Sequence, residues 1–214
     1  MSFDLLPLLL RGARITLLLT LAGATLALLM SLVAGLARMS TNRVVRSIAA
    51  TYVEVFRGTS VLVQMFWFYF ALPLFGISLS AFTAGTLALG LNVGAYGAEV
   101  VRGAIQAVPK GQTEAAIALN MSPRLRMRRV VLPQAFAMML PPFGNLLIEL
   151  LKATALVSLI TLPDLTFQAM SLRMTTGRTT EIFVWLLVLY FVIAYPLTLL
   201  VRWLEHRVTA YTKA

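Results

Sequence analysis

Five long apolar runs, separated by short polar segments, dominate this sequence of 214 residues. A helix needs about 20 residues to cross the roughly 30 Å hydrocarbon core of a bilayer, and each run is at least that long. Only 12% of the residues are charged, whereas about a quarter are charged in soluble domains. The pattern therefore predicts an all-α integral membrane protein with five transmembrane helices, in which residues 1–214 form a single domain. The runs cover residues 15–37, 55–75, 81–101, 134–162 and 182–204.

The uneven distribution of lysine and arginine predicts the orientation of these helices. With the N-terminus outside, the inside segments are 38–57, 102–133 and 202–214, and they hold thirteen basic residues. The outside segments hold four. Cytoplasmic loops of membrane proteins carry an excess of lysine and arginine. We therefore expect the N-terminus outside and the C-terminus in the cytoplasm.

Charge and composition also narrow the class of function. The net charge of +10 comes mainly from short loops beside apolar runs, as the orientation rule predicts, so it does not indicate a nucleic-acid-binding surface. Without cysteine, the chain can form neither a disulfide nor a thiolate metal site. No paired carboxylates or activated nucleophile of an enzyme can be recognised. We therefore expect no catalytic residue, no metal site and no nucleic-acid partner.

Two local patterns concern the second and third runs. Glu54 and Arg57 have a spacing at which they can pair on a helix, although both can also simply mark the membrane interface. Gly90 and Gly94 have the G-x-x-x-G spacing. Small residues at that spacing allow two helices to approach closely.

The fourth run is interrupted by Pro141, Pro142 and Gly144. Proline removes a backbone donor and kinks a helix. Two interpretations remain open, because the run can be a helix broken beside a transport path or a bent helix with a packing role.

Several polar side chains lie within the apolar runs at similar expected depth. Such groups are costly in hydrocarbon and normally face the bundle interior or a wet cavity. In one interpretation they line a path for a polar or zwitterionic solute. In the other, Glu149 and Lys152 neutralise each other at i,i+3 spacing, and the amides form hydrogen bonds across helices. The candidates for the path are Gln64, Asn92, Asn145, Glu149 and Lys152.

The longest water-compatible segment between apolar runs, residues 110–133, carries five of the 18 basic residues and predicts two short helices. Gly111 and Thr113 offer starts for the first helix. Glu114 is then expected in the first turn, where a carboxylate complements the helix dipole. The small apolar face of this helix consists of Ala115, Ala116 and Leu119.

The junction between the two helices is predicted at 120–123. Asn120 tolerates the left-handed conformation that ends many helices. Ser122 is a natural N-cap, and Pro123 suits the first position of the next helix. A short helix with a small apolar face fits a groove in a partner protein, while a basic helix resting on lipid headgroups is the alternative.

The order of residues in this segment resembles the EAA motif of bacterial ATP-binding-cassette (ABC) importer permeases. That motif reads E-A-A, three residues, Gly, nine residues, Ile, one residue, Leu-Pro. Here it begins at Glu114 and closes at Leu132 and Pro133, with Asn120 in place of Gly and Val130 in place of Ile. Both replacements are mild, because Asn also adopts the left-handed conformation and Val is branched and apolar like Ile.

Other segments are similar to those of permeases for polar amino acids of the histidine, glutamine and arginine type. Residues 54–59 resemble E-x-F-R-G-T, and residues 95–103 resemble A-Y-x-A-E-x-x-R-G. From Lys152 the chain reads K-A-T-A-L, where the usual pattern is K-D-T-S-L. This variant looks like that of permeases for ectoine and hydroxyectoine, which are cyclic, amino-acid-like osmolytes.

The resemblance implies a type I importer permease subunit in the bacterial inner membrane, dimeric with an identical or homologous permease. It also implies cytoplasmic ATPases bound to the loop 102–133 and an external solute-binding protein. ATP would be bound by the partner ATPase, and the chain itself would carry no cofactor. Membrane lipids would surround it. The resemblance assigns the coupling of ATPase closure to solute passage to Gly111, Glu114, Ala115, Ala116, Leu119, Asn120, Ser122 and Pro123.

Two other classes of function are alternatives to an ATP-driven importer. The sequence lacks the phosphate-binding pattern G-x-x-x-x-G-K-[ST], so an ATP-driven motor must be a separate chain. A self-sufficient secondary transporter usually has repeated halves with paired broken helices, which five spans with one central loop fit poorly. A membrane enzyme or scaffold is the third class, and the single histidine, His206, lies in the predicted cytoplasmic tail.

Overall fold

The computed structural model describes residues 5–212, and all regular secondary structure in that part of the chain is helical, without strands. The last two residues of the segment predicted to be inside, 213–214, are outside the described range. The α-helices are α1 (Leu6–Ala37), α2 (Arg43–Gly58), α3 (Val61–Phe66), α4 (Ala81–Ala107), α5 (Lys110–Ala118), α6 (Pro123–Arg126), α7 (Leu132–Ala153), α8 (Leu165–Thr176) and α9 (Thr179–Thr212). Shorter π and 3-10 segments are Trp67–Ala71, Leu72–Phe75, Met127–Val131 and Thr154–Ile160.

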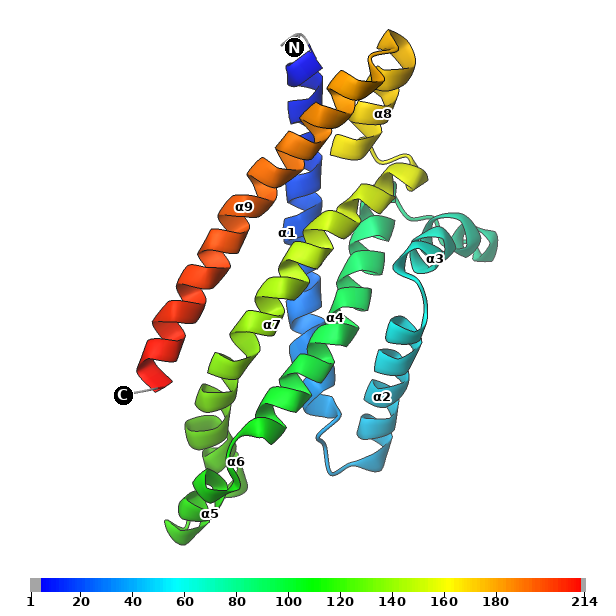
Figure 1. Ribbon diagram of the computed structural model, residues 1–214. Coiled ribbons are helices and arrows are strands. Elements are labelled where there is room, and N and C mark those ends of the chain that lie inside the picture. The colour runs from blue at the N-terminus through cyan, green and yellow to red at the C-terminus, as the bar shows by residue number, and fades with distance from the viewer. Residues whose placement is uncertain (1–4, 213–214) are drawn as a thin grey trace.

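Long helices form a bundle in which α4 packs against both α1 and α7, and α7 packs against α9 (Figure 1). The N-terminal end of α1 and α8 lie at one end of the bundle, and α5 and α6 project at the other. The C-terminal end of α9 points toward the end that carries α5. The loop between α4 and α7 is therefore separated from α8 by the length of the bundle.

Close packing of α1 on α4 depends on glycine. A Cβ atom on Gly90 would lie 2.7 Å from Leu26 Cδ2, and one on Gly94 would lie 2.8 Å from Met30 Cβ. The hydroxyl of Ser31 donates a 3.2 Å hydrogen bond to the carbonyl oxygen of Gly94. The G-x-x-x-G spacing therefore marks a close helix–helix approach, as the sequence predicted.

Within residues 5–212, three helical segments are long and apolar enough to cross a bilayer: Leu6–Ala37, Pro123–Ile160 and Thr179–Arg207. Counting the bent pair α2 and α3 as one span raises this number to four. Helix α4 has 27 residues, about 40 Å at 1.5 Å per residue, but glycine, threonine and Asn92 dilute its hydropathy. Because α4 lies between α1 and α7, little of it needs an apolar surface. The count of five remains a prediction.

The second predicted span, 55–75, is not one straight helix. Helix α2 ends at Gly58, α3 begins at Val61, and the two directions differ by 103°. Thr59 and Ser60 have extended backbone conformations. Continuity of the apolar run concealed this bend, because hydropathy does not register where the backbone leaves the helix.

Helix α7 is continuous through Pro141 and Pro142, so the interpretation of a broken helix is wrong at this point. Beyond Ala153 the chain tightens into the 3-10 segment Thr154–Ile160. A Cβ on Gly144 would lie 2.0 Å from Val201 Cγ1 of α9. The proline-glycine region therefore serves the packing of α7 against α9.

Asp164 forms a buried corner where α8 meets α1. Its carboxylate accepts hydrogen bonds from the backbone N–H groups of Thr166 (3.2 Å) and Phe167 (2.9 Å), and thereby caps α8. The hydroxyl of Thr16 accepts a 3.1 Å hydrogen bond from the backbone N–H of Leu165. Burial is the main cause that raises the Asp164 pKa to about 6, although the backbone hydrogen bonds oppose it. The corner fixes α8 firmly to the first helix.

Candidate functional site

The loop between α4 and α7 begins with α5, which starts at Lys110 directly after Pro109. Proline fixes φ near the helical value, and the N–H of Gln112 donates to the Pro109 carbonyl oxygen at 3.0 Å. The helix therefore starts earlier than Gly111 or Thr113. The expectation that Glu114 lies in the first turn is wrong, because Glu114 is the fifth residue of the helix.

The junction of the two loop helices lies where the sequence predicted it. Asn120 has φ 55°, a left-handed conformation. Its backbone N–H and that of Met121 donate to the carbonyl oxygens of Ile117 (2.8 Å) and Ala116 (3.0 Å). Ser122 then caps α6 by accepting from the Leu125 N–H at 3.4 Å. These hydrogen bonds satisfy carbonyl and amide groups that helix ends leave free.

Only part of the predicted apolar face of α5 is exposed. Ala116 is buried, whereas Ala115 and Glu114 are exposed and Leu119 is 77% exposed. Helix α5 packs against the Met127–Val131 turn, which accounts for its one buried residue. The surface available to a partner therefore includes Gly111, Glu114, Ala115, Ile117 and Leu119 of the helix and its end, together with the exposed junction residues Asn120, Ser122 and Pro123.

A side-chain contact connects this loop to the start of α7. The amide nitrogen of Gln134 donates to the side-chain oxygen of Gln112 at 3.3 Å and to the Val130 carbonyl oxygen at 3.0 Å. Gln112 belongs to α5 and Gln134 to the first turn of α7. Helix α5 is thus bonded to the long helix α7 through side chains, in addition to its connections along the chain.

Gln64 and Asn92 meet at the bend between α2 and α3. Both side-chain amides donate to the Phe56 carbonyl oxygen, at 2.9 Å from Gln64 and 2.7 Å from Asn92. Asn92 also donates to the side-chain oxygen of Gln64 at 3.3 Å, and Gln64 donates to the Thr59 hydroxyl at 2.7 Å. The interpretation that the amides bond across helices is therefore confirmed for these two residues.

A cavity of about 300 Å³ lies beside this bend, and Asn92, Tyr96 and Glu149 contribute its polar lining. Its apolar lining includes Val61, Leu89 and Leu146. The guanidinium of Arg57 lies 5.2 Å from the ring centroid of Tyr96. The Glu149 carboxylate thus lines a cavity of the size of a small solute, and the Arg57 guanidinium lies against Tyr96, another of its lining residues.

Lys152 does not pair with Glu149 in the part of the chain that the structure describes. It lines a separate groove of about 310 Å³ between α7 and α9, beside Tyr190 and Phe191. Asn145 is exposed one turn before Glu149 on α7. The structure therefore brings Gln64, Asn92 and Glu149 together and places Lys152 elsewhere.

Of the two interpretations of Glu54 and Arg57, the structure does not show the pair. Glu54 lies 3.8 Å from Arg38, and Arg57 lies over Tyr96. Among the described residues, no ion pair joins Glu54 to Arg57. Consecutive turns of α2 present the two side chains to different neighbours.

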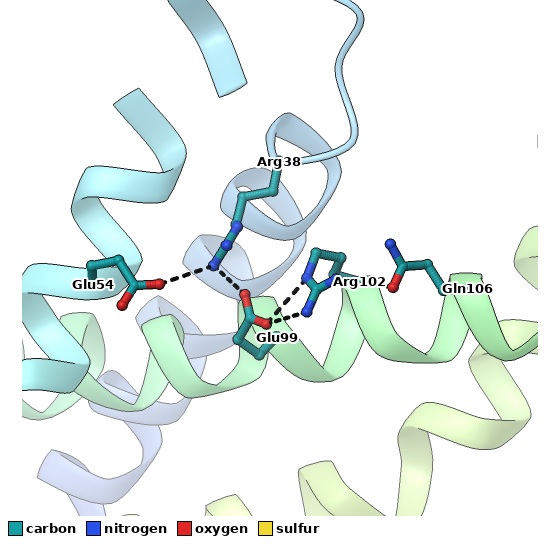
Figure 2. A network of polar contacts seen from close by, with 5 residues as sticks. All are labelled: Arg38, Glu54, Glu99, Arg102 and Gln106. Carbon is teal, nitrogen blue, oxygen red and sulfur yellow. Dashed lines mark hydrogen bonds and ion pairs between the residues drawn. The ribbon is translucent and has the colours of Figure 1, made fainter. Parts of the chain in front are cut away.

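The structure contains a charged network at the C-terminal ends of α1 and α4 that the sequence did not predict (Figure 2). Glu99 pairs with Arg38 and accepts hydrogen bonds of 3.1 and 2.7 Å from Arg102. Arg102 also donates to the side-chain oxygen of Gln106 at 2.9 Å. The 95–103 motif contained Glu99 and Arg102, but Arg38 is 61 residues away from Glu99 in sequence.

The bundle of long apolar helices, with an exposed capped loop and a cavity lined partly by polar side chains, has the architecture of a multi-pass membrane protein. Residues 27–210 match the family described as the binding-protein-dependent transport system inner membrane component. This chain belongs to that family.

Named relatives agree with this assignment. The chain is 48% identical over 207 residues to the probable amino-acid ABC transporter permease y4tF of Sinorhizobium fredii (strain NBRC 101917 / NGR234), covering 94% of this chain and 87% of the relative. It is 37% identical over 204 residues to the glutamine transport system permease GlnP of Escherichia coli (strain K12), covering 94% and 93%. The relatives are transport permeases and not enzymes.

A solved structure described as an amino acid ABC transporter with histidines matches with a TM-score of 0.89 and 40% identity. The match covers 97% of this chain and 100% of the matched chain. These findings identify the chain as a permease subunit of an amino-acid ABC importer.

Proposed function

We propose that this permease subunit passes an amino acid or amino-acid-like zwitterion across the bacterial inner membrane, driven by ATP hydrolysis in a separate cytoplasmic subunit. Its dimer partner is a second permease, identical or homologous, and an external binding protein delivers the solute. In this proposal the chain has five spans, and the lysine and arginine bias supports an N-terminus outside and an α5–α6 loop in the cytoplasm. The observation that carries this proposal is the exposed surface of α5.

Helix α5 has the properties of a docking element. Glu114, Ala115 and Leu119 are exposed, although the helix is held in place by its left-handed end and the Gln112–Gln134 hydrogen bond. A fixed helix with small and apolar exposed side chains fits a hydrophobic groove in another protein. The ATPase would bind this surface, and its closure would displace α5 together with α7.

The cavity beside Asn92 and Glu149 is the proposed solute path. Its volume of about 300 Å³ is at the lower end of the range of small-molecule pockets. The Glu149 carboxylate would accept hydrogen bonds from an ammonium group, and the Arg57 guanidinium beside Tyr96 would attract a carboxylate. Gln64 would contribute by holding the side chain of Asn92. Asn145, which is exposed, and Lys152, which lines the groove between α7 and α9, are not part of this cavity.

Relatives are named for different solutes, including glutamine in Escherichia coli and L-cystine in Bacillus subtilis. These names support the class of amino acids and their analogues for this chain. Within that class, Ala153 and Ala155 stand in the segment that resembles ectoine and hydroxyectoine permeases. A ligand screen of the transporter should therefore include ectoine and hydroxyectoine beside polar amino acids.

The test is the variant Glu114→Lys in the reconstituted transporter. We expect normal membrane insertion but loss of co-purification of the ATPase, because the variant reverses a charge on the docking helix. Arg124→Glu, a charge reversal on α6 outside the proposed surface, is the matched control. Undiminished co-purification and ATP-driven uptake with Glu114→Lys would contradict the proposed coupling. Uptake by the permease without any ATPase would instead indicate a secondary transporter.

A further inference from the structure

A second large cavity, away from the proposed solute path, lies between the end of α1, the start of α2 and the last turns of α4. Its volume is about 620 Å³, and four arginines line it together with Ser47 and Gln106. The arginines are Arg38, Arg43, Arg46 and Arg102. We call it the arginine cavity. Two of these arginines belong to the network drawn in Figure 2.

The charges of the arginine cavity are not balanced within the chain. Glu99 serves both Arg38 and Arg102. Glu54 approaches only Arg38, at 3.8 Å, and its side chain is 71% exposed. Among the described residues, no carboxylate forms an ion pair with Arg43 or Arg46, which line the cavity from α2. An anion is therefore the complement of this cavity.

Arginine clusters recognise phosphate through the planar guanidinium fork, which donates two parallel hydrogen bonds to phosphate oxygens. Ser47 and Gln106 add polar groups to the lining. The volume exceeds the needs of a single small anion and falls within the range of pockets for larger ligands. A phosphate carried on a larger group fits both the charge and the size.

The position of the cavity distinguishes a lipid phosphate from a soluble one. Arg43 and Arg46 line the cavity from one side of α2, while the opposite side exposes Val44 and Ile48, at 66% and 67%. The cavity also lies where α1, a membrane-crossing helix, ends. A phospholipid would place its phosphate against the arginines and its acyl chains beside the end of α1, where Leu32 and Leu36 are exposed. Val44 and Ile48 on the far side of α2 would contact neighbouring lipids.

We propose that the arginine cavity binds the phosphate headgroup of an anionic phospholipid. The bound lipid neutralises Arg43 and Arg46 and joins α1, α2 and α4 near the end of α4, which only two residues, Val108 and Pro109, separate from α5. This site is independent of the proposed solute path and of the docking surface on α5. Through this site the permease would bind anionic phospholipids in preference to other lipids of the membrane.

The experiment measures lipid binding to the intact transporter by native mass spectrometry in detergent, with phosphatidylglycerol and phosphatidylcholine as probes. The test variant is Arg43→Gln with Arg46→Gln. The matched control is Arg128→Gln with Arg129→Gln, which removes the same charge from exposed residues outside the cavity. We expect the test variant to bind phosphatidylglycerol roughly tenfold more weakly, since each basic residue near an anionic lipid adds affinity, and the control to bind as the unaltered protein does.

Several results would overturn the assignment. Equal binding of both lipids, or equal losses in test and control variants, would show general surface attraction only. Displacement of phosphatidylglycerol by millimolar inorganic phosphate would show that a soluble phosphate is the ligand. Loss of the ATPase from the test variant with unchanged lipid binding would show a protein partner. If the double variant aggregates, the single variants Arg43→Gln and Arg46→Gln give the same comparison.

Discussion

The side-chain amide of Asn92 in α4 donates a 2.7 Å hydrogen bond to the carbonyl oxygen of Phe56, in the last turn of α2. The last carbonyl groups of a helix have no partner within it, and here the chain turns by 103°. Asn92 therefore supplies a hydrogen bond that the bend removes from the helix. This hydrogen bond joins α4 to the bend between α2 and α3.

Replacing Asn92 by leucine should destabilise the protein. The Phe56 carbonyl oxygen would keep the Gln64 bond but lose the shorter one, at a cost of about 1–3 kcal/mol. The melting temperature in detergent should fall by about 2–4 °C for each kcal/mol. Asn145→Leu, an exchange of the same kind at an exposed position, is the control. Equal melting temperatures for the two variants would contradict this role of Asn92.

Replacing Glu149 by glutamine should weaken solute passage without disturbing the docking of the ATPase. The carboxylate lines the cavity with Asn92 and Tyr96, and loss of one charge-assisted hydrogen bond should reduce uptake about tenfold or more. Concentration-dependent uptake into proteoliposomes measures this effect. Lys152→Gln, which alters the other groove, should leave the apparent solute affinity unchanged. A larger effect on affinity from Lys152→Gln would move the path to the α7–α9 groove.

Replacing Gly12 by alanine should destabilise the junction of α1 with α8. A Cβ on Gly12 would lie 2.7 Å from the backbone oxygen of Asp164, and a backbone atom cannot rotate away as a side chain can. Overpacking of this kind costs about 1–3 kcal/mol. Gly103→Ala in α4, where the space around the Cβ is open, should instead be neutral or stabilising by up to about 1 kcal/mol. Thermal unfolding of both variants provides the comparison.

Asp164 should make the stability of the protein depend on pH. Burial raises its pKa from 3.8 to about 6, so the folded protein binds this proton more tightly than the unfolded chain. The contribution is present in full below pH 4, is lost as the pH rises through 6, and amounts to at most about 3 kcal/mol. Asp164→Asn keeps a good N-cap but cannot titrate. Melting temperatures of the two proteins should therefore change differently between these pH values, and parallel profiles would contradict the prediction.

Local chemistry made the loop junction predictable from the sequence. The left-handed conformation of Asn120, the cap at Ser122 and the proline that follows depend on neighbouring residues alone. The close approach of α1 to Gly90 and Gly94 was predictable for a similar reason, since small residues at that spacing have one common use.

Features that depend on tertiary neighbours could not be predicted from the sequence. The spacing of Glu149 and Lys152 allowed a pair as one of two interpretations, yet one faces the cavity beside α4 and the other the groove beside α9. Ala116 seemed equivalent to Ala115, but contact with the following turn buries it. No local pattern predicted the ion pair of Arg38 with Glu99, because the two residues meet only when α1 and α4 pack together.

The contact of Gln112 with Gln134 has a mechanical consequence. Helix α7 starts two residues before Gln134 and continues for 22 residues, about 33 Å at 1.5 Å per residue. Glu149 lies near its far end, in the wall of the cavity. A partner that displaces α5 would therefore act, through Gln112 and Gln134, on the same helix that carries Glu149 in the wall of the cavity.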